Sequence, residues 1–145
     1  GVPAAPVASS AVTDEDSPLR GCRVWCIDDA PRVREATGAL LRHWGCEATL
    51  VESAEQAMAL ARVGEAPDLL LLDYQLGADV TGLDLLPRLA GRWGVQPPTI
   101  VLSAQKDVQT RTRVQEAGLR FLPKPAAPAA LRAVISQALL ASGAS

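Results

Sequence analysis

The sequence predicts an α/β protein in which helices cover one parallel β-sheet. From Gly21 onward, short apolar runs alternate with amphipathic stretches five times, which is the pattern of strands joined by crossover helices. The run Leu69–Leu72 is made of leucine alone, as expected for a central strand buried on both faces. Four of the runs lead directly into a polar side chain, so a ligand site is expected at the carboxyl edge of the sheet.

Length and composition indicate one folded domain. The chain has 145 residues, of which 48% are hydrophobic, and this is enough for a single core. The formal net charge is -2, and no basic cluster is present, so direct nucleic-acid binding is not expected. No apolar run approaches the roughly 20 residues that cross a bilayer, and no signal segment opens the chain. We therefore expect no membrane contact by this chain and a cytoplasmic location, which is compatible with a membrane-anchored parent.

The ordered domain is expected to span residues 20–141. Residues 1–19 are rich in Ala, Pro, Ser and Val and carry an acidic cluster without helical or strand periodicity, which is typical of a flexible linker or tail. Residues 142–145 are expected to form a short C-terminal tail. The chain begins with Gly1 rather than methionine, which suggests a piece of a longer protein.

The first strand and helix are expected at Arg23–Ile27 and from Pro31 onward. Proline suits the first helical turn, and Gly45 should end the helix. Glu47–Val51 then follows as a strand of mixed polarity, plausible at a sheet edge. The apolar stripe of the helix is expected to face the core and follows helical spacing: it comprises Val33, Ala36, Thr37, Leu40, Leu41 and Trp44.

The second and third helices have start signals of their own. Ser53 followed by Gln56 predicts a capping box for the second helix, whose inner face would contain Ala54, Ala57, Met58 and Ala61. The third helix should begin near Thr81. Pro87 lies inside it and cannot donate a backbone hydrogen bond, so a late start or a kink is expected there.

The last two helices differ in their apolar content. The helix at about 107–117 is polar with few apolar anchors, so weak packing and high mobility are expected. The strand Arg120–Pro123 follows. The final helix should begin at Pro128 and present Leu131, Val134, Ile135, Ala138 and Leu139 at helical spacing.

The polar side chains after the strands should meet at one edge of the sheet. They are Asp28, Asp29, Asp73, Ser103 and Lys124. Three carboxylates brought together repel one another, and a hard divalent cation such as Mg²⁺, which prefers oxygen ligands, relieves that conflict. Ser103 could equally cap the helix that follows it. Cys26 and Cys46 are interpreted as small buried hydrophobes.

This set of motifs resembles the receiver domains of two-component response regulators. The resemblance rests on the acidic pair Asp28-Asp29, on Asp73, on Ser103-Ala104 and on the segment Phe121–Pro125, and it covers the whole predicted domain. It implies a flavodoxin-like fold of five βα units with strand order 2-1-3-4-5. It also implies that the Lys124-Pro125 peptide bond is cis.

The resemblance further implies a phosphorelay function with magnesium as cofactor. Asp73 would take a phosphoryl group from a phosphohistidine of a histidine kinase or a histidine phosphotransfer domain. Asp29 would bind Mg²⁺ directly and Asp28 mainly through water, with Asp73 and the Gln75 carbonyl completing the ligands. Ser103 and Lys124 would hold the phosphoryl oxygens, and Phe121 would change rotamer on activation. The face formed by the helix at 107–117, the strand 120–123 and the final helix would then switch.

The segment after the phosphoacceptor indicates a placement within a longer protein. Asp73-Tyr-Gln-Leu76 followed by Thr81-Gly82 resembles receivers at the C-terminus of hybrid sensor histidine kinases, and the short tail after the final helix agrees with that. The parent chain would then be a kinase, while the domain itself supports only its own aspartyl phosphorylation and dephosphorylation. The segment at 74–82 lacks the usual proline and is one residue longer before the glycine, so its conformation is left open.

Three other functions are considered. A stand-alone single-domain response regulator would carry the same site. A haloacid-dehalogenase-like phosphatase also uses an aspartate nucleophile and Mg²⁺, but it requires a second Asp two residues later, where this chain has Gln75. A docking domain that keeps the fold without the chemistry is disfavoured because all five site residues are present.

Overall fold

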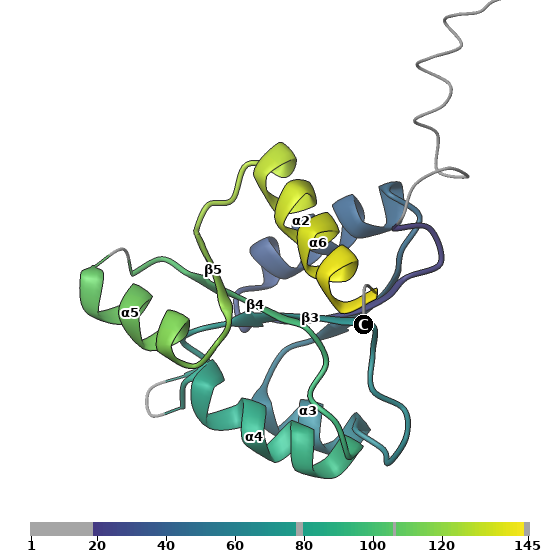
Figure 1. The fold of residues 1–145 in the computed structure, drawn as a ribbon, viewed down its shortest axis with the longest axis horizontal. Coiled ribbons are helices and arrows are strands. Elements are labelled where there is room, and N and C mark those ends of the chain that lie inside the picture. The colour runs from purple at the N-terminus through teal and green to yellow at the C-terminus, as the bar shows by residue number, and fades with distance from the viewer. Residues whose placement is uncertain (1–18, 78–79, 106, 144–145) are drawn as a thin grey trace, which may run out of the picture.

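The computed structural model describes residues 19–77, 80–105 and 107–143. Within them, helices cover both faces of a five-stranded parallel sheet of order β2-β1-β3-β4-β5 (Figure 1). The elements in chain order are β1 (Arg23–Ile27), α2 (Pro31–His43), β2 (Glu47–Val51), α3 (Ala54–Leu60), β3 (Leu69–Asp73), α4 (Gly82–Trp93), β4 (Thr99–Ser103), α5 (Val108–Glu116), β5 (Arg120–Pro123) and α6 (Pro128–Gly143). The α/β class and the flavodoxin-like strand order are therefore confirmed.

The core consists of two layers, one on each face of the sheet. Helices α2 and α6 cover one face, and α3, α4 and α5 lie on the other (Figure 1). Strand β3 contributes to both layers: Leu69 and Leu71 pack under α2 and α6, whereas Leu70 and Leu72 pack against the opposite helices. Each is essentially inaccessible to solvent, and burying one such side chain stabilises the fold by about 1.5–3 kcal/mol.

The limits of the folded part differ slightly from the expected 20–141. Leu19, expected in the linker, is fully buried in the core under α2 and α6, so the fold begins at least one residue earlier. Helix α6 continues to Gly143. Residues 1–18 and 144–145, which make up the rest of the two expected tails, lie outside the described residues.

The core-facing stripe of α2 is narrower than the sequence predicts. Thr37, Leu41 and Trp44 are buried, as expected. Val33 and Ala36 are exposed, because they line an open groove instead of the core. Helical spacing identified the correct face of α2 but could not show that a groove opens over its first turns.

The starts of α3 and α4 are fixed by side-chain caps. Ser53 Oγ accepts a hydrogen bond from the Gln56 backbone N at 3.0 Å, but the Gln56 side chain bonds Glu52 N rather than Ser53 N. A reciprocal capping box occurs instead at α4, between Thr81 and Asp84, where only the helix start near Thr81 was expected.

Helix α4 does not start late. It begins at Gly82 and continues through Pro87, because the capping box fixes its first turn ahead of the proline.

Among the described helices, none combines the length and apolar character that a bilayer crossing requires.

Two glycines of α4 allow a matched test of how tightly it packs on the site. A Cβ on Gly82 would lie 2.5 Å from the Asp73 carbonyl oxygen, whereas a Cβ on Gly91 would meet nothing within 4 Å. Gly82→Ala should therefore lower the free energy of unfolding by about 1–3 kcal/mol through overpacking. Gly91→Ala should raise it by about 0.5–1 kcal/mol through helix propensity. Urea titrations of both variants measure these changes, and equal effects would contradict the close approach at Gly82.

Candidate functional site at the carboxyl edge of the sheet

Asp28 and Asp73 are placed side by side by two central strands. Strands β1 and β3 are paired with Ile27 opposite Leu72, so the next residue on each strand is an aspartate. Asp28 N also donates to the Val51 carbonyl at 3.0 Å, which continues the β1–β2 pairing. The two side chains are buried, with exposed fractions of 4% and 6%. The sheet register therefore brings two carboxylates together in a pocket with little access to water.

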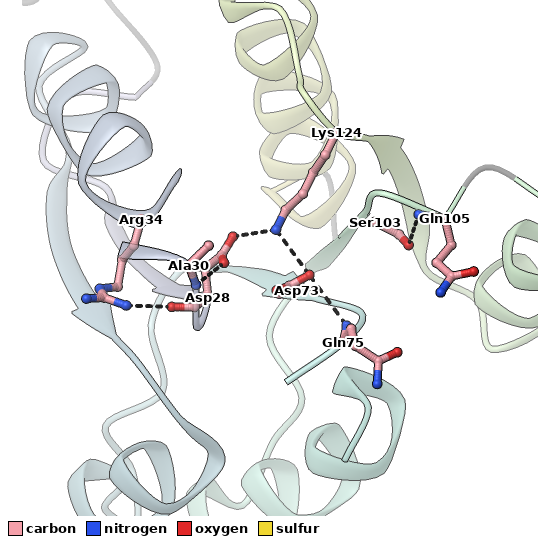
Figure 2. Close-up of polar contacts among 8 residues, drawn as sticks. All are labelled: Asp28, Ala30, Arg34, Asp73, Gln75, Ser103, Gln105 and Lys124. Carbon is pink, nitrogen blue, oxygen red and sulfur yellow. Dashed lines mark hydrogen bonds and ion pairs between the residues drawn. The ribbon is translucent and has the colours of Figure 1, made fainter. Parts of the chain in front are cut away.

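Lys124 reaches these carboxylates from the edge strand β5 (Figure 2). Its Nζ lies 2.8 Å from Asp28 Oδ2 and 3.2 Å from Asp73 Oδ1. The Lys124 backbone N donates to the Ser103 carbonyl at 2.9 Å, which ties the residue to β4. The Lys124-Pro125 peptide bond is cis, as the family resemblance implied. One ammonium group thus bridges two acids that come from different strands.

Backbone and side-chain donors hold the segments around the carboxylates. Ala30 N donates to Asp28 Oδ1 at 2.9 Å, and Arg34 Nη1 donates to the Asp28 carbonyl at 2.8 Å (Figure 2). Gln75 N donates to Asp73 Oδ1 at 3.4 Å. The start of α2 therefore holds one acid, while the turn after β3 holds the other.

The electrostatics of the pocket follow from burial and from excess negative charge. Burial, and next the charge of Asp28, raise the pKa of Asp73 from 3.8 to about 7, although Lys124 and the Gln75 N–H act in the opposite direction. Burial by itself would lower the pKa of Lys124, but its bonds and charge interactions with Asp28 and Asp73 outweigh this and raise it. Lys124 is therefore charged at neutral pH, while Asp73 is poised between its neutral and ionised forms.

Asp29 completes a group of oxygen ligands suited to a metal ion. Its side chain is exposed, and one carboxylate oxygen from each of Asp28, Asp29 and Asp73 lies within 4.8 Å of the others. The group contains no sulfur or imidazole, which matches the preference of Mg²⁺ for oxygen. Lys124 balances only part of the charge of three acids. The donor set and its uncompensated charge therefore fit a divalent cation.

Ser103 lies at the edge of this pocket, but its hydroxyl is turned to its own loop. It is 1% exposed, and its Oγ accepts from Gln105 N at 2.9 Å (Figure 2). The interpretation of Ser103 as a helix cap is wrong, because Asp107 caps α5 and its Oδ1 accepts from Thr110 N at 2.8 Å. The structure thus brings Asp28, Asp29, Asp73 and Lys124 together, with Ser103 beside them.

Of the remaining predicted site residues, Phe121 lies on β5 and Gln75 lies in the turn after β3, where its backbone N bonds Asp73. Phe121 is half-buried on β5, and the Arg111 guanidinium of α5 lies 5.3 Å from its ring centroid. Gln75 is exposed and pairs with Thr81 across the turn after β3. Leu76 N also bonds the Val80 carbonyl at 2.9 Å, so the two sides of the segment at 74–82 are paired. Residues 78 and 79 lie outside the described residues.

An apolar groove opens next to the carboxylate pocket, between α2 and the segment that joins β5 to α6. Its volume is about 590 Å³. The groove is lined by Ala30, Arg32, Val33, Ala36, Thr37, Leu40, Leu102, Ala104, Lys124, Pro125, Ala126 and Leu131. Lys124 belongs to both the groove and the pocket, so a molecule that occupies the groove is adjacent to the site.

Sequence reasoning missed Arg34, Arg111 and the groove. Arg34 lies in the first turn of the helix that follows Asp28, and this position was the available signal for its contact with the Asp28 carbonyl. The contact of Arg111 with Phe121 and the groove both form between elements distant in the chain. No local sequence pattern marks them.

Comparison with known families agrees with this geometry. Residues 24–136 match the family model described as the response regulator receiver domain. The chain belongs to this family, and as a receiver it is a phosphoacceptor module of two-component signalling. Receivers in general interact with histidine kinases or histidine phosphotransfer proteins.

Solved structures give the same fold. The chain is 19% identical to the receiver domain of the Francisella response regulator 1452, with a TM-score of 0.73 over 84% of this chain and 99% of that one. It is 24% identical to a CheY-like receiver domain protein from Methanospirillum hungatei JF-1, with a TM-score of 0.70 over 82% and 94%. NtrX from Brucella abortus, solved with ATP, is 26% identical, with a TM-score of 0.75 over 85% of this chain and 28% of NtrX. The comparison with curated proteins gave no match.

The raised pKa of Asp73 predicts how stability depends on pH. Because folding favours the neutral acid, its contribution is complete below the unfolded pKa of about 4 and is lost as the pH rises to about 7. Asp73→Asn mimics the neutral form and should not show this loss. In metal-free buffer the unfolding free energy of the native chain should therefore fall relative to the variant by roughly 2–4 kcal/mol between about pH 5 and pH 8.

Urea titrations in the presence of a chelator measure this difference. Glu116→Gln is a matched control, because Glu116 is exposed at the end of α5, and this variant should follow the native chain. A gap between the native chain and Asp73→Asn that does not change with pH would contradict the raised pKa.

Proposed function

We propose that Asp73 is the residue that accepts the phosphoryl group, and that the donor is a phosphohistidine on a histidine kinase or a histidine phosphotransfer domain. The observation that carries the proposal is the contact of one ammonium, Lys124 Nζ, with both Asp28 and Asp73 in a buried pocket. Asp73 is the last residue of the central strand, so its carboxylate is held rigidly at the mouth of that pocket.

The residues around Asp73 suit phosphoryl transfer. Its ionised carboxylate attacks phosphorus, the bond from phosphorus to the histidine nitrogen breaks, and that nitrogen leaves with the electron pair. A carboxylate is a weak nucleophile, so the acceleration comes from positioning and charge neutralisation. Lys124 carries a positive charge within 3.2 Å of Asp73 Oδ1, which neutralises charge on the transferring group.

Mg²⁺ is the cofactor that we propose for this site. Asp29 would hold it directly and Asp28 mainly through water, with Asp73 and the Gln75 carbonyl as the remaining protein ligands. When bound, Mg²⁺ neutralises negative charge on the phosphoryl oxygens and on the carboxylates. The close grouping of three carboxylates supports this assignment.

Phosphorylation is proposed to act through Ser103 and Phe121. An aspartyl phosphate adds roughly two negative charges and strong acceptor oxygens. The Ser103 hydroxyl would leave the Gln105 N–H and donate to these oxygens, which draws its loop toward Asp73. Phe121 would then turn inward from its contact with Arg111, so that the face of α5, β5 and α6 has two arrangements that partners can distinguish.

The placement of the domain in a hybrid sensor histidine kinase is part of the same proposal. The pattern Asp73-Tyr-Gln-Leu76 and the Thr81-Gly82 start of α4 support it. A stand-alone response regulator is the alternative for the same site. A dehalogenase-like phosphatase is disfavoured, because Gln75 stands where its second aspartate is required.

The apolar groove is the proposed contact surface for the phosphohistidine donor. A donor must place its imidazole close to Asp73, and the groove shares Lys124 with the carboxylate pocket. Val33 and Ala36 of α2 are exposed there. An amphipathic helix that carries the histidine would bury these side chains as it delivers the phosphoryl group.

Asp73 should be the only aspartate that a small acyl phosphate modifies. With Mg²⁺ present, intact mass spectrometry should show a gain of about 80 Da on the native chain. The gain should be absent from Asp73→Asn and strongly reduced when a chelator removes Mg²⁺.

Asp68→Asn is the control for this labelling experiment, because Asp68 lies at the opposite edge of the sheet, before β3, where it accepts a bond from Arg23 N. This variant should be labelled like the native chain. Labelling of Asp73→Asn at the native rate would overturn the assignment of the phosphoacceptor.

Val33→Asp should affect phosphoryl transfer from a protein donor differently from labelling by a small acyl phosphate. A buried charge in the groove should slow transfer from a phosphorylated histidine phosphotransfer domain by about tenfold or more. Labelling by a small acyl phosphate should continue, because the described bonds that hold Asp28 and Asp73 come from Lys124, Ala30, Arg34 and Gln75 and not from Val33.

Val63→Asp provides the matched control for the groove, since Val63 is 78% exposed after α3, outside the groove. Its transfer rate should equal that of the native chain. An unchanged rate for Val33→Asp would show that the donor does not use the groove.

A further inference from the structure

Cys22 and Cys46 occupy paired positions at the edge of the sheet opposite Asp73. Each is the residue immediately before a strand, and Arg23 pairs with Glu47 as β1 and β2 begin. Two backbone hydrogen bonds bracket the cysteines: Gly21 N donates to the Gly45 carbonyl at 2.7 Å, and Glu47 N donates to the Cys22 carbonyl at 2.8 Å. The segments that lead into β1 and β2 are therefore already paired at the positions of the two cysteines.

This backbone separation is compatible with a disulfide. Neighbouring strands lie about 4.8 Å apart, and disulfides span roughly 4.4–6.8 Å between Cα atoms. The two side chains also lie on the same face of the sheet, because both belong to the core layer under α2 and α6. The backbone spacing and the shared face therefore permit a bond between the sulfurs.

The two thiols are buried and close enough to influence each other. The interaction with Cys46 raises the pKa of Cys22, and the interaction with Cys22 lowers the pKa of Cys46; their exposed fractions are 7% and 6%. Cys26 differs, because its neighbours in the sheet are Leu50 and Leu71. Of the three cysteines, all of which are reduced in this structure, only Cys22 and Cys46 are placed to react with each other.

The interaction between the two thiols makes their pKa values unequal. The interaction with Cys22 lowers the pKa of Cys46 despite its burial, and the positive charge of Arg132 acts in the same direction. The same interaction, together with burial, raises the pKa of Cys22. Arg132 is held nearby on α6, with its guanidinium 5.9 Å from the Trp44 ring centroid. Cys46 is therefore the thiol that ionises first and attacks first.

We propose that Cys22 and Cys46 form a reversible disulfide when the protein meets a low-molecular-weight disulfide. The Cys46 thiolate attacks one sulfur of that reagent and expels the other as a thiolate, which gives a mixed disulfide. Cys22 then loses its proton, attacks the Cys46 sulfur and expels the second thiolate. In total two protein thiols are oxidised, and one reagent disulfide is reduced to two thiols.

This modification site is independent of the proposed phosphoacceptor. It lies at the amino end of β1, whereas Asp28 follows the carboxyl end of the same strand. A disulfide there would link edge strand β2 covalently to central strand β1. Paired thiols of this kind in reducing compartments typically serve redox sensing, so the receiver would carry a second input, separate from phosphorylation.

The test uses the folded 145-residue chain with glutathione disulfide as the probe. After incubation, the protein is unfolded in an alkylating reagent, and the modified cysteines are mapped by mass spectrometry. The proposal expects one alkylated cysteine, Cys26, and a linked peptide containing Cys22 and Cys46, with a mass loss of about 2 Da. Dithiothreitol should restore three alkylated thiols.

Variants distinguish the steps of the reaction. Cys22→Ala should stop at a stable glutathione adduct on Cys46, whereas Cys26→Ala should form the disulfide at the native rate. The assignment of modified cysteines in the native chain does not depend on any variant, so the proposal can still be tested if a variant fails to fold. Three alkylated thiols after incubation, a lasting glutathione adduct on the native chain, or a link that includes Cys26 would overturn the proposal.

Discussion

Asp28 and Asp73 are two buried acids held next to each other by adjacent strands, and the Lys124 ammonium between them is the contact on which the site depends. Burying like charges side by side is costly unless an opposite charge lies with them. One lysine offsets this repulsion only in part, and the raised pKa of Asp73 reflects the remainder. The same uncompensated negative charge that destabilises the fold favours the binding of a cation. Stability and chemistry thus depend on the same three side chains.

The fold confines the repulsion between Asp28 and Asp73 to the carboxyl edge of the sheet. The strands that carry the acids lie at the centre of the sheet and are buried on both faces by leucine-rich layers. Their positions therefore vary little. The parts proposed to respond are at the periphery, where Phe121 is only half-buried beneath Arg111 and α5 buries only Thr110 and Val114. The proposed switch thus joins a densely packed centre to a helix with few buried side chains.

Opposite edges of the sheet carry different chemistry. The carboxyl edge gathers carboxylates, Lys124 and the apolar groove, which together suit a protein that delivers a phosphoryl group. The amino edge places Cys22 beside Cys46. Because β1 begins at one edge and ends at the other, a single strand joins the two proposed inputs.

The α/β class, the five strands and the residues that end them are all predictable from the amino-acid sequence. These follow from local patterns: leucine runs mark buried strands, and helical spacing marks the helices between them. Asp28, Asp73 and Lys124 could be grouped from sequence because parallel strands must end at one edge. Ser53 was likewise readable as a cap, although Gln56 bonded a different backbone group than expected.

Which side chains contact each other, and which remain exposed to solvent, depends on how the elements pack in three dimensions. Val33 has the spacing of a core residue but lines an open groove and is 36% exposed. Ser103 bonds its own loop rather than capping α5. The pairing of Cys22 with Cys46 depends on the register of two strands. Contacts between elements distant in the chain are set by packing and register, and no local residue pattern encodes them.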